Sequence, residues 1–229
     1  MMVGLLKKAG CTVDYISPHR FNDGYGLNMN RIREVINKKY AGLITLDCGI
    51  SNINEINTLK EESPDTVVLI MDHHKCPDVL PNADAIINPQ LADKTHPAYN
   101  LCSAALVDYV FRTTPSLQID PTPYIDLAAI GLIADVMPLT NLNRWYVKKG
   151  LEAIQTQPRQ TILELCISAK VNHKTITTQD IGFGIGPRLN APGRLGDPKP
   201  VVELLLSSEE NEIREKIQTI EQLNNKRRS

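Results

Sequence analysis

Acidic and imidazole side chains follow apolar runs of this sequence at points where a metal ion could bind. Asp47 ends one short run, and His73 and His74 lie just beyond the next. Asp135 ends a longer apolar stretch, where a carboxylate is costly to bury unless it is paired or bound to metal. Mixed carboxylate and imidazole donors suit Mn²⁺ or a similar divalent ion. We therefore predict a metal site that contains Asp47, His73 and Asp135.

The elements that must position these side chains alternate between strand and helix. Apolar, β-branched runs predict strands at 42–47, 66–71 and 85–89, and a helix at 54–60 connects the first two. This alternation is typical of an α/β fold with a parallel sheet and helices on both faces. Ligand sites of such sheets lie at the carboxyl ends of the strands, where the first two strands end in an acid.

Helical patterns dominate the chain after the predicted sheet. Periodic apolar positions and helix-end signals predict helices at 101–112, 124–134, 145–155, 161–169 and 209–228. The stretch 181–196 is rich in glycine and proline, which predicts an ordered loop. Asp197 then opens a further helix with Pro198 at its first position.

The segment before the first sheet strand contains shorter signals. A helix is expected to end at Gly10, and the next residues, 11–16, predict a short strand. A polar loop follows, and Asn28 or Asn30 can cap the helix after it.

Composition limits the class of protein. The chain has 229 residues, 42% of them hydrophobic, and a formal net charge of -1. That charge gives no global attraction to nucleic acid, so such a partner must meet local basic clusters. The five cysteines include no C-x-x-C pair, which argues against a disulfide framework or a cysteine zinc site and favours a cytoplasmic protein. We find no segment apolar enough to span a membrane.

Five motifs in order resemble those of the RecJ branch of the DHH phosphoesterase superfamily. The stretches 46–51, 71–74 and 134–139 resemble three motifs of the superfamily. The stretches 18–27 and 186–195 narrow the resemblance to the RecJ branch. Order and spacing agree over nearly the whole chain.

The resemblance implies a metal-dependent enzyme that degrades single-stranded DNA from the 5′ end, with Mn²⁺ or Mg²⁺ as cofactor. Asp47 would bridge two ions ~3.5–4 Å apart, and His73 and Asp135 would complete the shell of one ion. His74 would lie near the scissile phosphate as a hydrogen-bond donor. Asp72 would orient a histidine from outside the metal shell.

Other residues are expected to bind the nucleic acid. The resemblance assigns phosphate contacts to Arg20, Arg188 and Arg194, whose planar donors suit a phosphate group. Asn190 belongs to the same motif as the last two arginines and joins this set. Ser103 opens a helix at a family-like position, and a helix N-cap is an equally good interpretation of it.

Two family features are not found in the printed sequence. One is an Asp-rich first motif, which the family pattern places before Met1, and the other is a C-terminal domain, which it places after Ser229. We therefore expect an N-terminally incomplete DHH core over 1–206 and the start of a connecting helix over 207–229. We also expect at most a partial metal site with very weak nuclease activity, and a gap or exposed edge in the sheet between the strands predicted at 11–16 and 43–46.

Three functions remain open at this point. The leading one is a 5′→3′ single-stranded-DNA exonuclease core in DNA repair and recombination. The second is a phosphodiesterase that acts on short oligonucleotides or cyclic dinucleotides. The third is an inactive binding module of a replication or repair complex. The resemblance also allows single-strand-binding or helicase proteins as partners, and it implies no membrane.

Overall fold

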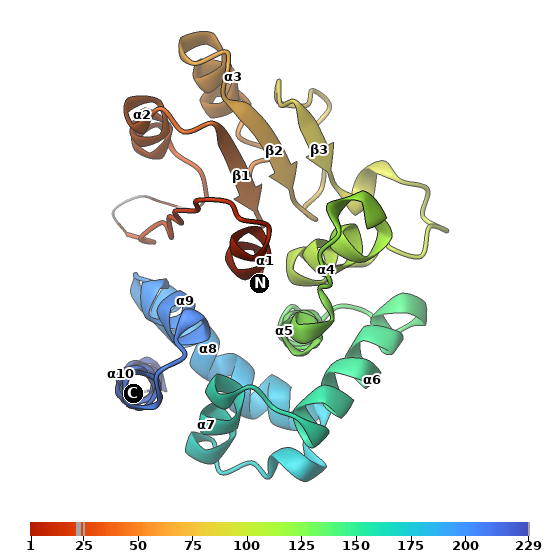
Figure 1. Ribbon diagram of the computed structural model, residues 1–229, viewed down its shortest axis with the longest axis vertical. Helices are drawn as coiled ribbons and strands as arrows, with labels where there is room; N and C mark the ends of the chain where they lie inside the picture. Colours follow the sequence, from red (N-terminus) through yellow and green to blue (C-terminus); the bar gives the residue numbers. More distant parts are fainter. Residues whose placement is uncertain (22–23, 25, 229) are drawn as a thin grey trace.

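A three-stranded parallel sheet forms the upper part of the molecule in Figure 1. The computed structural model describes residues 1–21, 24 and 26–228. The strands lie in the order β1 (Gly42–Leu46), β2 (Val67–Met71) and β3 (Ala85–Ile87). The predicted parallel sheet is confirmed, with its third strand shorter than expected.

Helices cover both faces of this sheet. One face packs on α2 (Met29–Lys38) and α3 (Ile53–Glu62), and the other on α1 (Met2–Lys8) and α4 (Ser103–Thr113). Side chains alternate accordingly along β2, because successive residues of a strand point to opposite faces. Val68 and Ile70 join the α2–α3 cluster, while Leu69 and Met71 join the cluster of α1 and α4.

The first helices begin and end at residues that suit those places. The side chain of Asn28 accepts a hydrogen bond from the backbone N–H of Arg31, so Asn28 is the N-cap of α2. Gly10 has a φ of 80° just after α1, a left-handed conformation that stops a helix and favours glycine. Both expectations from the sequence are confirmed.

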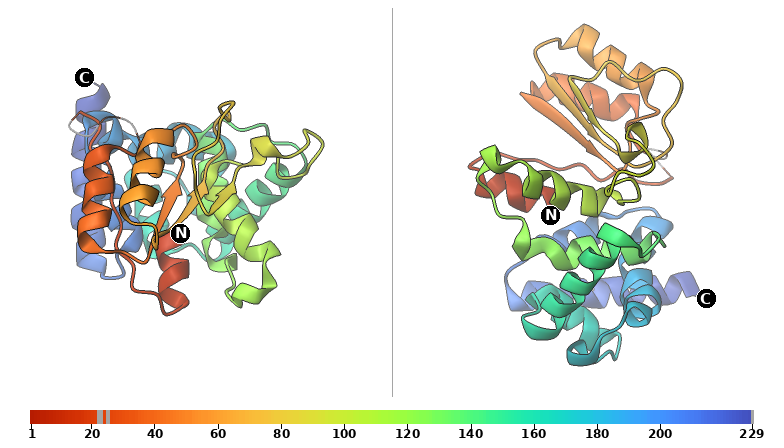
Figure 2. Two further views of the ribbon diagram at one scale, coloured as in Figure 1. Left: turned by 90° about the horizontal axis from the view of Figure 1, so that it is seen from above. Right: turned by 90° about the vertical axis from the view of Figure 1, so that its right-hand side faces the viewer.

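The remaining long helices form the lower part of the molecule. They are α5 (Ile125–Ala134), α6 (Asn141–Thr156), α7 (Gln160–Ser168), α8 (Gly186–Leu195), α9 (Lys199–Leu206) and α10 (Glu210–Arg228). Short 3₁₀ turns lie at Pro89–Leu91, Pro115–Leu117, Thr122–Tyr124 and His173–Thr175, and a π-helix spans Asp180–Ile185. The views in Figures 1 and 2 place α4 and α5 between the sheet and the other helices.

Helix α5 connects the two hydrophobic cores. Ile125 and Leu132 pack in the core beneath the sheet, while Leu127 and Ile130 pack in the core of the lower helices. A helix that is apolar on all sides is typical of a fully buried element. Helix α10 adds Ile217 and neighbouring isoleucines to the lower core, and the boundary expected between 206 and 207 stays a prediction.

Two predicted elements are wrong. Residues 11–16 form no strand, and most of them are exposed with no neighbouring strand to pair with. Nearly all of the stretch 181–196 is helical rather than a loop, because Ile181 and Ile185 are buried in the lower core and Leu189 packs against it. Tertiary packing there outweighs the poor helix propensity of glycine and proline.

The edges of the sheet are formed by β1 and β3. Segment 11–16 does not pair with β1, and among the described residues β1 has a ladder only with β2. Within the same residues, no helix is both long and apolar enough to cross a membrane.

Candidate metal centre

The ends of β1 and β2 bring Asp47 and Asp72 to one edge of the sheet. Leu46 pairs with Met71, and each is the last residue of its strand. The ladder continues one step, because the backbone N–H of Asp47 donates to the carbonyl of Met71 at 3.1 Å. The residues that follow both strands therefore meet at the carboxyl edge, as the sheet topology predicts.

Three side chains at this edge are arranged to hold a cation. One ligand atom from each of Asp47, His73 and His74 lies within 4.8 Å of the others. His73 Nε2 lies 3.1 Å from Oδ1 of Asp47. Oxygen and imidazole nitrogen donors at this spacing fit Mn²⁺ or a similar divalent ion.

Asp72 holds the turn that carries both histidines. Its side chain is buried, and Oδ1 accepts the backbone N–H groups of His73 and His74 at 2.7 and 3.1 Å. The Nδ1 atom of His74 lies 2.7 Å from the same oxygen. With Nδ1 committed to Asp72, Nε2 is the His74 nitrogen available to a ligand.

Asp135 lies at the end of α5, next to this cluster but outside its tightest set. Besides burial, the charge of Asp47 raises the pKa of the Asp135 carboxyl, and the charges of His73 and His74 lower it, so Asp135 lies within electrostatic range of the cluster. Helix α5 approaches α4 closely because Gly131, which has no side chain, faces the start of α4. A Cβ on Gly131 would lie 2.7 Å from the Cβ of Ala104, so a larger residue would push the two helices apart.

Left-handed backbone conformation occurs at Asp47 and directly after Asp135. Asp47 has a φ of 62° and Val136, directly after Asp135, has a φ of 55°. This conformation is uncommon for non-glycine residues and is an outlier for a β-branched side chain. Strained backbone of this kind concentrates at functional sites, where the surrounding structure holds it.

Electrostatics at the site favour an ionised Asp47 beside a basic His73. Partial desolvation opposes ionisation of Asp47, although its side chain is 58% exposed. The hydrogen bonds from His73 and Ser103 outweigh this effect and hold the pKa of the carboxyl below the usual range. The hydrogen bond to Asp47 raises the pKa of His73. Burial, and then the charge of Asp47, raise the pKa of Asp135.

The nearby thiols stay protonated at neutral pH. Burial, together with the charges of Asp72 and Asp47, raises the pKa of Cys48 to about 11. Burial raises the pKa of Cys102 to about 12. Metals bind thiolates rather than thiols, so the donors at this edge are oxygen and nitrogen.

Ser103 contacts Asp47. Its hydroxyl donates a 2.9 Å hydrogen bond to Oδ1 of Asp47, a contact that the sequence did not predict. Cys102 is the N-cap residue of α4, and Ser103 is the first residue of the helix rather than its cap. No local signal links residues 56 positions apart; only the packing of α4 under the sheet brings them together.

The loop that contains Arg20 lies against the end of α8. The backbone N–H of Arg20 donates to the carbonyl of Gly196 at 2.6 Å. Gly196 has a φ of 131°, and a Cβ there would lie 2.7 Å from Cε1 of His19. Two stretches far apart in sequence, 18–21 and 186–196, thus meet, while Asn22, Asp23 and Tyr25 of the same motif lie outside the described residues.

The other predicted phosphate-binding residues differ in their surroundings. Arg188 donates through Nε to Glu221, through Nη1 to the carbonyl of Gly184 and through Nη2 to that of Ser168. These contacts join α8 to α7 and α10. Arg194 and Asn190 are exposed, and no hydrogen bond or ion pair of either side chain is found among the described residues. A phosphate role for each stays a prediction.

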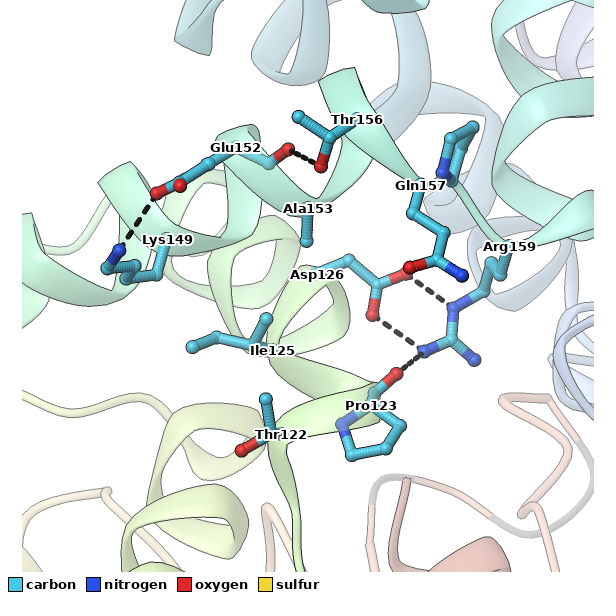
Figure 3. A pocket seen from close by; sticks show the side chains of 11 residues that line it. Thr122, Pro123, Ile125, Asp126, Lys149, Glu152, Ala153, Thr156, Gln157 and Arg159 are labelled. Atoms are coloured by element: carbon cyan, nitrogen blue, oxygen red, sulfur yellow. Dashed lines mark hydrogen bonds and ion pairs between the residues drawn. The ribbon is translucent and has the colours of Figure 1, made fainter.

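A cavity of about 650 Å³ lies at the other end of α5. Asp126, at its floor, accepts hydrogen bonds from Nε and Nη2 of Arg159, and Nη2 also donates to the carbonyl of Pro123 (Figure 3). The Arg159 guanidinium lies over the Tyr124 ring at 5.2 Å. Asp126 precedes Asp135 by nine residues, roughly 13 Å along a helix, so this cavity is separate from the candidate metal centre.

Comparison with known proteins gives matches over the whole chain. The model of the DHH family, N-terminal domain, matches residues 1–132. The single-stranded-DNA-specific exonuclease RecJ of Haemophilus influenzae is 39% identical over 228 residues, which cover 94% of this chain and 39% of that protein. The exonuclease of the same name from Bacillus subtilis is 35% identical over 99% of this chain and 28% of that protein.

A solved structure agrees with these matches. The crystal structure of exonuclease RecJ bound to manganese matches with a TM-score of 0.86 and 29% sequence identity. The match covers 99% of this chain and 57% of that one. The chain spans well under half the length of the two curated relatives.

Proposed function

The chain belongs to the DHH family, and from this premise we propose that it is the catalytic core of a metal-dependent exonuclease that hydrolyses single-stranded DNA from the 5′ end. The observation that carries the proposal is the convergence of Asp47, His73 and His74 at one edge of the sheet, with Asp135 beside them. The relatives named as single-stranded-DNA-specific exonucleases support the choice of substrate.

Asp47, His73 and Asp135 are the proposed ligands of Mn²⁺ or Mg²⁺. The donors fit these ions, because Asp47 and His73 offer a carboxylate oxygen and an imidazole nitrogen within 4.8 Å of each other, Asp135 adds a second carboxylate beside them, and the nearby thiols stay protonated. A related exonuclease structure holds manganese. When bound, such an ion supplies Lewis-acid polarisation of the phosphodiester and a more acidic water.

The remaining residues are proposed to bind and orient the strand. His74 is fixed by Asp72 and is proposed to donate from Nε2 to the scissile phosphate. Arg194, Asn190 and Arg20 are proposed to contact the sugar-phosphate backbone, because phosphate contacts give position without reading sequence. Residues 1–206 are proposed to form the core, and 207–229 to begin a connecting helix. The free cysteines support a cytoplasmic location.

The test compares long single-stranded DNA, duplex DNA and dinucleotides as substrates in the presence of Mn²⁺. We expect slow release of mononucleotides from the 5′ end of the single strand, with Asp47→Asn as the inactive control. Preferential cleavage of dinucleotides would favour a phosphodiesterase. Tight binding of single-stranded DNA without cleavage would favour a binding module.

A further inference from the structure

We infer that Ser103 is a positioning residue that fixes the Asp47 carboxylate for cation binding. The inference rests on the proposed metal centre and deepens it. The Ser103 hydroxyl donates a 2.9 Å hydrogen bond to Oδ1 of Asp47. Ser103 itself is 7% exposed, so little of this residue is in contact with bulk water.

Asp47 needs such an anchor because its own side chain is open to solvent. The Asp47 side chain is 58% exposed, whereas that of His73 is 16% exposed. An exposed carboxylate samples several rotamers, and a metal ligand must lose that freedom on binding. A partner that already selects one rotamer reduces this entropy cost, as preorganised contacts do in general.

Ser103 can act as an anchor because the start of α4 is tightly held. Gly131 of α5 lies so close that a Cβ on it would be 2.7 Å from the Cβ of Ala104 and 3.2 Å from Sγ of Cys102. The hydroxyl therefore projects from a helix start wedged between α5 and the sheet. Groups on rigid elements hold ligands more precisely than groups on loops.

The two polar contacts of the Asp47 carboxylate are made to the same oxygen. Ser103 Oγ and His73 Nε2 both lie near Oδ1, at 2.9 and 3.1 Å. Among the described residues, no hydrogen bond to Oδ2 is found. The Ser103 hydroxyl thus ties Oδ1 to the start of α4, and Oδ2 is left for a cation that His73 would also bind, while the neutral hydroxyl adds no competing charge.

This role differs from the nucleic-acid contact that the sequence analysis expects for Ser103. A serine hydroxyl has one proton to donate, and here that proton is committed to Asp47. Ser103 therefore acts through Asp47, and its loss is expected to change cation affinity before it changes strand affinity.

The experiment measures Mn²⁺ binding by titration calorimetry on the wild-type chain, Ser103→Ala and Ser103→Thr. Alanine keeps the helix start and removes only the hydroxyl, so we expect Mn²⁺ to bind roughly 10-fold more weakly, the low end of effects seen for such partners of metal ligands. Threonine retains the hydroxyl and should restore most of the affinity. Thermal melting of the metal-free chains checks that each variant folds.

Thr45→Val is the matched control. Thr45 Oγ1 is also buried near the end of β1, yet it has no hydrogen-bond partner among the described residues. We expect this variant to bind Mn²⁺ like the wild type.

A Ser103→Ala variant with wild-type Mn²⁺ affinity would overturn this inference but not the proposed metal centre. A second overturning result is a raised KM for DNA at saturating Mn²⁺ with unchanged Mn²⁺ affinity, which indicates a phosphate contact. A wild-type chain that takes up no Mn²⁺ would overturn the proposed centre together with this inference.

Discussion

Nδ1 of His74 lies 2.7 Å from Oδ1 of Asp72, whose side chain is 1% exposed. The same carboxylate accepts backbone N–H groups from His73 and His74, and its Oδ2 accepts that of Ile50 at 3.2 Å. A buried carboxylate with this many donors fixes the turn after β2 and the direction of the His74 imidazole. It also ties that turn to the one that follows β1.

Replacing Asp72 by asparagine should destabilise the fold as well as the site. The amide NH₂ would face backbone donors and leave at least one buried N–H without an acceptor, at a cost of about 2–3 kcal/mol. Urea unfolding measures the change in the free energy of unfolding. Asp78→Asn is the matched control, because Asp78 is an exposed acid a few residues further along. Equal stability of the two variants would show that Asp72 does not hold the turn.

Cation binding should strengthen as pH rises. The hydrogen bond to Asp47 raises the pKa of His73 above its ordinary value of 6.5, and an imidazolium has no lone pair for a cation. When the solution is acidified, Mn²⁺ affinity should therefore begin to fall before the pH has dropped to 6.5.

In the metal-free chain, the contribution of His73 to stability should show the opposite pH dependence. Because the pKa of His73 is raised in the folded chain, protonation of His73 stabilises the fold. This contribution is fully present below pH 6.5 and is lost as pH rises through the pKa of His73 in the folded chain. The lowered pKa of Asp47 contributes above 3.8 and is lost as pH falls through its folded value. The rise in Tm caused by Mn²⁺ should thus be larger at about pH 8 than at about pH 6. A rise that does not change with pH would contradict the assigned role of His73.

Gly49 should tolerate no side chain. Its φ is 107°, and a Cβ there would lie 2.4 Å from Oγ1 of Thr45. Gly10 also has a positive φ, 80°, but a Cβ on it would meet nothing within 4 Å. We expect Gly10→Ala to cost about 1 kcal/mol, from backbone strain alone, and Gly49→Ala to cost clearly more. Chemical denaturation of both variants gives the comparison, and equal costs would mean that the clash at Gly49 relaxes freely.

Arg188 and Arg194 should have different roles although they share one motif. Arg188→Met removes a guanidinium that joins Glu221 to two backbone carbonyls, and it should lower stability by roughly 2 kcal/mol, less than for a fully buried pair. Arg194→Gln should leave stability unchanged, because Arg194 is exposed.

Binding of single-stranded DNA separates the two arginines further. Losing one phosphate contact reduces the slope of log K against log salt by about 0.7, and we expect this change for Arg194→Gln. Fluorescence titrations at several salt concentrations measure it. A reduced slope for Arg188→Met, with no loss of stability, would instead favour the phosphate role that the resemblance implies for Arg188.

The sequence predicted the sheet and the placement of its acids because both depend on local patterns. Short apolar runs mark β1 and β2, and strand ends in a parallel sheet must share an edge, so Asp47 and His73 meet. The strand expected at 11–16 had the right composition but no partner, and a strand needs a neighbour to form its ladder.

The parts that could not be predicted depend on contacts between distant residues. The helix at 186–195 contains Pro192 and forms because its apolar side packs in the lower core. The bond from Ser103 to Asp47 and the contact between Gly131 and Ala104 arise from the approach of α4 and α5. His74 joins the tightest donor set and Asp135 does not, which motif order alone does not reveal.

The most direct test of the metal centre is an anomalous difference map from crystals of the chain soaked in Mn²⁺. We predict a peak at the carboxyl edge of the sheet, in contact with Asp47, His73 and Asp135, and no peak there for Asp47→Asn. Mn–O and Mn–N distances near 2.2 Å would be consistent with direct ligation, about the value for small divalent ions. A map without a peak at this edge, or with Mn²⁺ bound only elsewhere, would contradict the assignment.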